Sequence, residues 1–223
     1  ADPSPPAPLP EAERGEKDQR TTALTPKQAS KLKILDPACG SGSFLLGAYQ
    51  YLLDWHLTQY KADPDKYQKE LFRDALGEWS LTTQEKKRIL LNNIYGVDID
   101  AQAVEVTKLS LLLKVLENET QETINQQRQL FHGERVLPDL ASNIKCGNSL
   151  IGPDFYDEPT QGELYDGKVE VDGINVFDWR MGFPSIMKSG GFDAVVGNPP
   201  YVGFHGFAEL KEYLRKHYVS AHG

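Results

Sequence analysis

Cysteine and metal-binding side chains are scarce in this sequence. Its 223 residues include two cysteines, Cys39 and Cys146, which lie in separate segments and which we expect to be reduced and unpaired. The five histidines show no spacing typical of metal ligands, so no metal site is predicted. These shortages argue against a disulfide-stapled domain and against a metalloenzyme.

Long apolar runs and an N-terminal targeting pattern are missing as well. No segment approaches the ~20 apolar residues that a membrane-spanning helix requires. No signal-peptide pattern is present either. We therefore expect a cytoplasmic protein that makes no contact with a membrane.

An excess of basic residues, the usual footprint of a protein that grips duplex DNA, is also absent. The chain has 24 Lys and Arg residues against 32 Asp and Glu residues, which gives a formal net charge of −8. A basic cluster at Lys211, Arg215 and Lys216 is interpreted as the solvated face of a helix. The charge balance thus argues against autonomous DNA binding.

Composition divides the chain into a tail and one domain. Five of the first ten residues are proline, and we predict that residues 1–24 form a disordered tail rich in proline and charge. The remaining residues, 25–223, have the length of a single domain.

The sequence does contain a distinctive glycine-rich turn, between a β-prone run at 32–35 and an apolar stretch that begins at Ser43. Leu45 stands where a dinucleotide-binding turn needs its third glycine, and no lysine follows the glycines as it does in a P-loop. A carboxylate at Asp36 would repel a phosphate. The turn therefore favours a cationic ligand, and S-adenosylmethionine, which carries a sulfonium and an ammonium group, suits it. The string reads Asp36-Pro37-Ala38-Cys39-Gly40-Ser41-Gly42-Ser43-Phe44.

A second predicted strand, 94–97, ends in an acidic pair and leads into an apolar helix over 101–117. Asp98 is the candidate acceptor for ribose hydroxyls, because an acidic residue has this role at the end of the second strand in doubly wound folds. Asp100 is interpreted as the N-cap of the following helix.

A polar insertion over 61–91 separates the glycine turn from Asp98 by more than the usual distance. Asp63-Pro64 should break the preceding helix, and two helical patterns follow. Thr82 and Glu85 have the spacing of a capping box that starts the second of these helices.

Two further strands are predicted near the C-terminal half of the chain. The first, beginning at Ile144, ends in a polar turn at Asn148, which taken alone would be a turn residue. The second, 192–196, is nearly continuous in apolar residues, as expected of a strand that is buried on both faces. It leads through Gly197 into Asn198-Pro199-Pro200-Tyr201, a string that could also be a loop or a proline-rich recognition peptide.

Together, the glycine turn and the Asn-Pro-Pro-Tyr string resemble the cofactor and adenine sites of N6-adenine DNA methyltransferases. From Thr25 to Tyr201 the chain is similar to the methyltransferase region of large single-chain restriction-modification and phage-defence enzymes. The resemblance implies an α/β fold with a doubly wound, mostly parallel Rossmann-like sheet and S-adenosyl-L-methionine as cofactor. It also implies cofactor contacts by Asp36, Pro37, Ala38, Cys39, Gly40, Ser41, Gly42, Phe44, Asp98, Ile99, Asn148 and Ser149, and catalysis by Asn198, Pro199, Pro200 and Tyr201.

The resemblance also suggests how the substrate is held. The Asn198 side-chain oxygen and the Pro199 carbonyl would accept the hydrogens of the adenine amino group, and Tyr201 would stack on the flipped base. DNA would be bound by the intact protein through a recognition domain that lies beyond this sequence. We accordingly expect the chain to be the N-terminal part of a catalytic domain, with a sheet that is incomplete at its C-terminal side.

Three alternatives remain open at this stage. Protein-glutamine methyltransferases share a similar tetrapeptide, and an RNA methyltransferase is a further possibility. A third reading is an inactive or cofactor-binding chain that acts only in an assembly. If the strand at 192–196 pairs in the intact protein with a fifth strand encoded beyond this sequence, it would present an unpaired apolar edge here, through which we expect self-association.

Overall fold

The computed structural model describes residues 24–74, 77–117, 119, 137–156, 175–199 and 208–218. The predicted tail over 1–24 therefore lies almost entirely outside the described residues. Pro200 and Tyr201 lie outside them as well. The proposed division of the chain into a tail and a domain stays a prediction.

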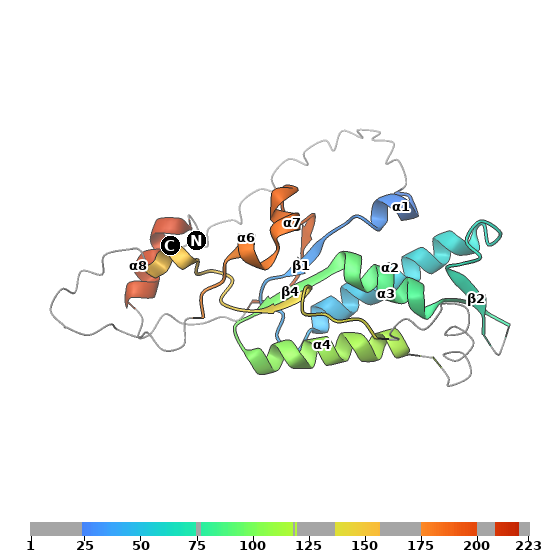
Figure 1. The fold of residues 1–223 in the computed structure, drawn as a ribbon, viewed down its shortest axis with the longest axis horizontal. Helices are drawn as coiled ribbons and strands as arrows, with labels where there is room; N and C mark the ends of the chain where they lie inside the picture. The colour runs from blue at the N-terminus through green and yellow to red at the C-terminus, as the bar shows by residue number, and fades with distance from the viewer. Residues whose placement is uncertain are drawn as a thin grey trace, which may run out of the picture.

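A four-stranded parallel sheet forms the centre of the fold, as predicted (Figure 1). The strand order is β5-β4-β1-β6, and each neighbouring pair is parallel. The first predicted strand thus lies between the second and the fourth. The strands are β1 (Ile34–Asp36), β4 (Ile94–Asp98), β5 (Ile144–Cys146) and β6 (Ala194–Val195).

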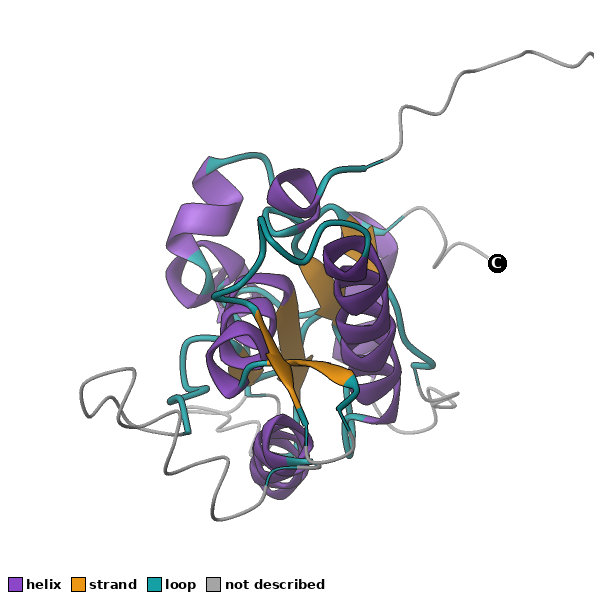
Figure 2. Cartoon of the chain, turned by 90° about the vertical axis from the view of Figure 1, so that its right-hand side faces the viewer, coloured by secondary structure: helices purple, strands orange, loops and turns teal. Residues whose placement is uncertain are grey.

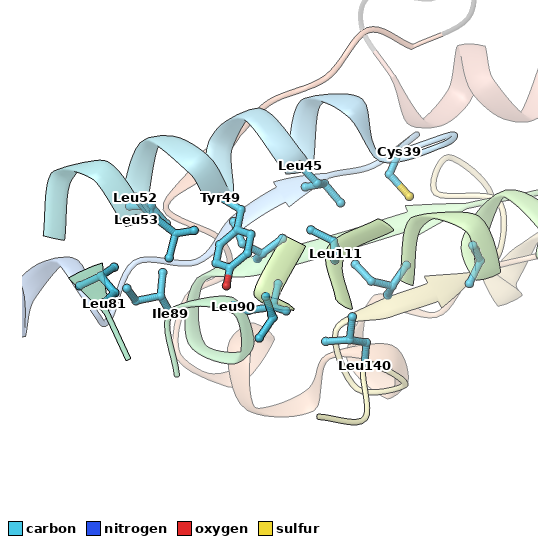
Figure 3. Close-up of a cluster of buried hydrophobic side chains, with 14 of the residues drawn as sticks. Cys39, Leu45, Tyr49, Leu52, Leu53, Leu81, Ile89, Leu90, Leu111 and Leu140 are labelled. Atoms are coloured by element: carbon cyan, nitrogen blue, oxygen red, sulfur yellow. The ribbon is translucent and has the colours of Figure 1, made fainter. Parts of the chain in front are cut away.

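Helices cover both faces of this sheet (Figure 2). Because side chains alternate along a strand, Ile34 and Leu35 point to opposite faces and join different apolar clusters. The larger cluster forms against α2 (Ser43–Lys61), α3 (Thr83–Asn93) and α4 (Ala101–Leu116), as Figure 3 shows. A sheet with helices on both faces is the doubly wound arrangement that the sequence indicated.

The second face is covered by two short helices, α6 (Trp179–Gly182) and α7 (Pro184–Lys188). Phe183 and Ile186 pack there against Leu35, Tyr95 and Val97, with Trp179 alongside. These aromatic and aliphatic side chains thus cover the second face of the sheet.

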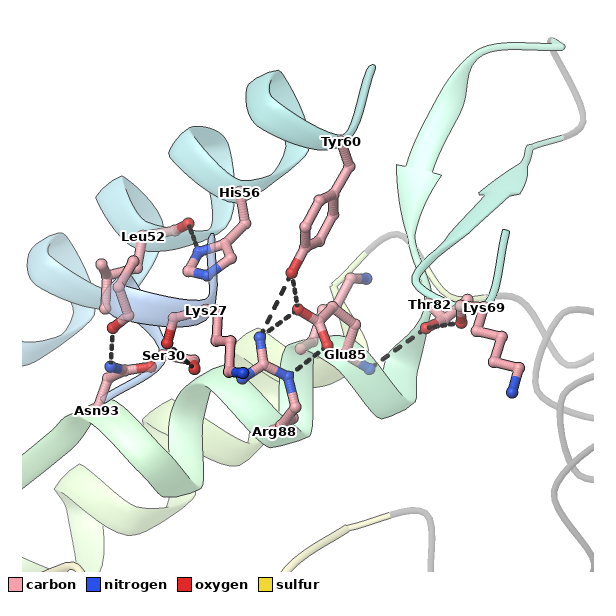
Figure 4. A network of polar contacts seen from close by, with 12 residues as sticks. Lys27, Ser30, Leu52, His56, Tyr60, Lys69, Thr82, Glu85, Arg88 and Asn93 are labelled. Carbon is pink, nitrogen blue, oxygen red and sulfur yellow. Dashed lines mark hydrogen bonds and ion pairs between the residues drawn. The ribbon is translucent and has the colours of Figure 1, made fainter. Parts of the chain in front are cut away.

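Side-chain caps start several helices where the sequence predicted them. Asp100 accepts a hydrogen bond from the backbone N–H of Gln102 at 2.8 Å, and Thr82 accepts one from Glu85 at 3.3 Å. The Glu85 carboxylate, however, does not complete a capping box. It is buried against α2, where it accepts hydrogen bonds from the Tyr60 hydroxyl at 2.6 Å and from Nε of Arg88 at 2.6 Å (Figure 4).

The described residues of the insertion over 61–91 contain one helix, α3, and not two, so this part of the prediction is wrong. Ahead of α3, β2 (Leu71–Arg73) and β3 (Trp79–Leu81) form an antiparallel hairpin. Cross-strand pairing buries Leu71 opposite Leu81 and places the Arg73 guanidinium 4.1 Å from the centre of the Trp79 ring.

The burial predicted for the fourth strand is also wrong. Within the described residues β6 pairs with β1 alone, and Val195 is 66% exposed. An apolar run therefore need not be covered on both faces when the strand has one partner.

Three smaller helical elements complete the described structure. They are α1 (Pro26–Ala29), a 3-10 turn at Pro153–Tyr156 and α8 (Ala208–His217). Tyr213 and Leu214 of α8 pack on Ile151, beside the 3-10 turn. Among the described helices, none combines the length and the apolar character needed to cross a membrane.

Candidate functional site

The carboxyl ends of the four parallel strands meet at one edge of the sheet, and each carries a segment singled out in the sequence. β1 leads into the glycine turn, β4 into Asp98 and Ile99, β5 into Asn148, and β6 into Asn198. β1 pairs with β4 on one side and with β6 on the other. From β1 to β5 the strands follow in chain order in one direction, and β6 is added on the opposite side of β1, so the order reverses between β1 and β6. Such a switch point is where open α/β sheets bind ligands.

Asp36 lies beneath this edge, and its side chain is 1% exposed. Its Oδ1 accepts a hydrogen bond from the Ala38 N–H at 3.1 Å. Burial raises the pKa of this carboxyl, and the nearby Asp98 raises it further. A Cβ built on Gly197 would lie 2.5 Å from Asp36 Oδ1, so only glycine lets the segment after β6 approach this carboxylate. Asp36 thus lies between the glycine turn and the segment that leads to Asn198.

Gly40 is a partly buried residue of the turn, and its backbone is held from two sides. Its N–H donates to Asp98 Oδ2 at 2.7 Å, and its carbonyl accepts from Thr107 Oγ1 at 2.7 Å. Its φ is +51°, and a Cβ built there would meet nothing within 4 Å. One side of Gly40 is therefore open for the close approach of a ligand.

The second glycine, Gly42, has neighbours that differ from those of Gly40. Gly42 has a φ of +84° and is the N-cap of α2, where it offers no side-chain cap. A Cβ built on it would lie 2.8 Å from Cγ2 of the buried Thr107. Ser41 and Phe44, the latter 48% exposed, flank it on the surface.

Cys39 is placed in the core beneath the turn. Its N–H donates to the Val97 carbonyl at 3.0 Å, and its sulfur faces Gly96, where a Cβ would lie only 3.1 Å away. Burial raises the pKa of the thiol to about 12. Pro37 and Ala38, by contrast, are half-buried at the edge. The side chain of Cys39 is thus less accessible to a ligand than its neighbours in the turn.

Both carboxylate oxygens of Asp98 accept hydrogen bonds from backbone N–H groups. Besides Gly40, the N–H of Asp100 donates to Asp98 Oδ1 at 3.0 Å. A carboxylate oxygen has two acceptor positions, so each oxygen can still accept a ribose hydroxyl. Ile99 follows with its side chain about half exposed beside the same edge.

The turn after β5 is braced by a segment that the sequence analysis did not assign to the site. Asn148 accepts the Leu150 N–H on Oδ1 at 3.1 Å, which is the turn role, and its N–H donates to the Asn175 carbonyl at 2.6 Å. The Ser149 carbonyl accepts from Trp179 Nε1 at 3.1 Å. Asn175 has a φ of +44°, which asparagine tolerates better than most residues.

Asn198 and Pro199 are exposed directly after β6. The Val196 N–H donates to the Leu35 carbonyl at 2.8 Å, so this segment is fixed to β1 immediately before it leaves the sheet. The structure thus brings Asn198 to the same edge as Gly40 and Asp98. Pro200 and Tyr201 of the same string lie outside the described residues.

Thr107 is a site residue that sequence reasoning missed. It occupies a buried position of α4 in a row that otherwise contains Val104, Leu111 and Val115. A single polar residue in an apolar helical row was the available signal, since such a group is buried only with a hydrogen-bond partner.

Two models of known protein families match the two halves of the chain. A model described as "N-6 DNA Methylase" matches residues 20–132, which include the glycine turn and Asp98. A second, described as "Eco57I restriction-modification methylase", matches residues 92–223, which include Asn148 and the Asn198 segment.

Similar proteins come from several bacteria. The type II restriction enzyme and methyltransferase RM.Eco57I of Escherichia coli is 36% identical over 195 residues, covering 85% of this chain and 17% of that protein. The adenine-specific methyltransferase BrxX of Escherichia coli O9:H4 is 30% identical, with 88% and 19% covered. The adenine-specific methyltransferase PglX of Streptomyces coelicolor is 27% identical, with 77% and 12% covered.

The matched region thus makes up less than a fifth of each of these relatives. Each family match covers about half of the chain or more, and together they include both the glycine turn and the Asn198 segment. The chain belongs to the N-6 DNA methylase family, and over residues 92–223 it also matches the Eco57I restriction-modification methylase family.

Proposed function

We propose that this chain carries the methyl-transfer site of an enzyme that methylates the N6 position of adenine in DNA, within a restriction-modification or defence system. One observation carries the proposal: Gly40, Asp98 and Asn198 lie at the same edge of one parallel sheet, at its switch point. This edge combines an open backbone turn, a carboxylate acceptor and an exposed amide.

The residues at this edge fit S-adenosylmethionine. The open side of Gly40 admits a ligand against the backbone, and the Asp98 carboxylate retains acceptor positions for ribose hydroxyls. The Asp98 carboxylate gives the edge an acidic group, which suits a cationic ligand. The exposed side chains of Phe44 and Ile99 offer apolar contacts. When bound, the cofactor supplies a methyl group activated by the sulfonium.

Asn198 and Pro199 would prepare the base. The adenine amino nitrogen is a poor nucleophile, because its lone pair is delocalised into the ring. Hydrogen bonds from the amino group to the Asn198 side-chain oxygen and the Pro199 carbonyl concentrate electron density on that nitrogen, so a strong base is not required. Both residues are exposed, as residues that meet a substrate must be.

The remaining roles extend the same proposal to the whole protein. Tyr201 stacks on a base that has been flipped out of the duplex, a contact worth about 1–3 kcal/mol. With a net charge of −8, this chain relies on a separate recognition domain of the intact protein to hold DNA. The site of action is then the cytoplasm, where the DNA is.

The test is methyl transfer by the natural full-length protein that carries this chain. Radiolabelled S-adenosylmethionine is offered with unmethylated DNA, RNA or protein, and the modified DNA nucleosides are identified by mass spectrometry. We expect N6-methyladenine in DNA alone. Asn198→Ala should lower the rate by about 100-fold or more while cofactor affinity stays within about twofold, because the amide contacts the base. Labelled glutamine or RNA without labelled DNA would overturn the proposal.

A further inference from the structure

Thr107 presents an unusual case of a polar side chain inside an apolar helix face. It is 0% exposed and lies on the side of α4 that packs over the sheet. A buried hydroxyl costs free energy unless its hydrogen bond is made. Here the bond is made to a residue 67 positions earlier, the Gly40 carbonyl, at 2.7 Å.

The two hydrogen bonds of Gly40 act on different peptide groups. Asp98 Oδ2 accepts the N–H of the peptide that joins Cys39 to Gly40. Thr107 Oγ1 donates to the carbonyl of the peptide that joins Gly40 to Ser41. Both peptide planes beside the open Cα are thereby hydrogen-bonded, in a turn that is also closed by the Gly42 N–H, which donates to the Cys39 carbonyl at 2.7 Å. Among the side-chain bonds to Gly40, the one from Thr107 acts on the second plane.

The methyl group of Thr107 has a separate effect on the turn. Cγ2 lies 2.8 Å from the position of a Cβ on Gly42, so it fills the space that a side chain there would occupy. One side chain therefore meets both glycines, the first through its hydroxyl and the second through its methyl group.

We propose that Thr107 is a positioning residue that sets the affinity for S-adenosylmethionine, and this rests on the proposed function. It holds the Gly40 backbone in the shape that receives the cofactor before the cofactor arrives. A turn that is already ordered loses less conformational entropy on binding, and this difference appears as affinity. Thr107 itself lies beneath the turn and does not touch the ligand.

The experiment separates the hydroxyl from the methyl group in the natural full-length protein. Thr107→Ser keeps the hydroxyl and Thr107→Ala lacks it, while both lack the methyl group. Thr107→Val keeps the shape and lacks the hydroxyl. The matched control is Thr58→Val on α2, which removes an exposed hydroxyl that donates to the Asp54 carbonyl at 2.8 Å.

Calorimetry gives the dissociation constants for S-adenosylmethionine and S-adenosylhomocysteine, and thermal unfolding without ligand reports the fold. We expect Thr107→Ala and Thr107→Val to weaken binding about tenfold, Thr107→Ser less than about threefold, and Thr58→Val not at all. In methyl transfer, KM for S-adenosylmethionine should rise with little change in kcat.

The outcomes distinguish the two proposals. Wild-type protein that binds neither ligand would overturn the proposed function, and the role of Thr107 with it. Wild-type binding together with equal affinities of the Ser and Ala variants would overturn the role of Thr107 alone. If Thr107→Val does not fold, the Ser and Ala pair decides, because neither introduces a methyl group facing the Gly40 carbonyl.

Discussion

At the scale of single residues, Gly40 and Gly42 share a left-handed backbone and differ in what surrounds them. A side chain at Gly40 would project into open space, whereas one at Gly42 would meet the buried Thr107. The left-handed conformation itself costs a non-glycine residue about 1–2 kcal/mol at either position. The two glycines are therefore expected to fail in different ways when they are replaced.

We predict that Gly40→Ala leaves a folded protein that has lost cofactor binding, because its methyl group occupies the open side of the turn. Gly42→Ala should instead lower the free energy of unfolding by about 2 kcal/mol more than Gly40→Ala does, since a clash with Thr107 adds to the backbone cost. Urea unfolding and ligand titration check both. Strong cofactor binding by Gly40→Ala would show that the open side of the turn is not where the ligand lies.

The two cysteines provide a second residue-scale prediction, which depends on pH. Burial raises the pKa of Cys39 to about 12, so its thiol stays neutral at mildly alkaline pH and is a poor nucleophile. Cys146 is exposed. In folded protein at about pH 8.5 we expect iodoacetamide to modify Cys146 and spare Cys39, and in urea to modify both. Peptide mass spectrometry measures this, and equal labelling without urea would contradict the core position of Cys39.

Sequence reasoning at this scale works best for residues whose role depends on neighbours in the chain. Asp100 and Thr82 cap helices that begin beside them, and both were predicted. Thr107 was missed because its partner, Gly40, is 67 residues away. A hydrogen bond of that range follows from packing α4 on the sheet, which local patterns do not contain.

At the scale of elements, two buried asparagines fasten the junction between α3 and β4. Asn93 Nδ2 donates to the carbonyls of Ala29 and Leu32 at 2.8 and 2.7 Å. Asn143 Nδ2 donates to the carbonyls of Leu91 and Ile94 at 2.9 and 2.8 Å. Each side chain thus satisfies two carbonyls and ties elements that are distant in sequence.

Removing one of these asparagine side chains should lower the free energy of unfolding. We predict that Asn93→Ala lowers the free energy of unfolding by about 2 kcal/mol or more, because two carbonyls lose their donor and a cavity remains. As a control, Gln50→Ala removes a surface amide that donates to Asp54 at 2.7 Å and should cost under ~0.5 kcal/mol. Chemical denaturation gives both values. Similar losses for the two variants would mean that Asn93 does not join α1 to α3.

The helices and strands of the central sheet that begin with an apolar run were predicted, and the hairpin in the polar insertion was not. The helix expected over 101–117 is α4, and the strand expected over 94–97 is β4. The hairpin of β2 and β3 was taken for a helix, because strands of three residues are too short to show an alternating pattern. Their pairing rests on cross-strand contacts such as Arg73 with Trp79.

At the scale of the whole molecule, β6 lies at one edge of the described sheet. Within the described residues it pairs with β1 alone, and Val195 is 66% exposed. An open apolar strand edge is a template for pairing with a further strand. We predict that the chain self-associates in a concentration-dependent way through this edge.

Sedimentation over a range of concentrations measures this association. Val195→Lys should reduce it, because a charged side chain on an edge strand opposes edge-to-edge pairing. Lys114→Ala, on the far side of the sheet at α4, serves as the control and should change nothing. A wild-type chain that remains monomeric at every concentration would contradict the prediction.

The pairing of β6 with β1 also determines how late in translation the sheet can be completed. The Lys33 N–H is bonded to the carboxylate of Asp193, 160 residues later, so this pair cannot form until nearly the whole described sheet has left the ribosome. At about 5–20 residues per second, the roughly 90 residues from Thr107 to Asn198 take about 5–18 s to translate. During that interval the nascent chain already holds Gly40, Asp98 and Thr107. S-adenosylmethionine bound there would stabilise the unfinished domain by mass action, in a chain that cannot yet act on DNA.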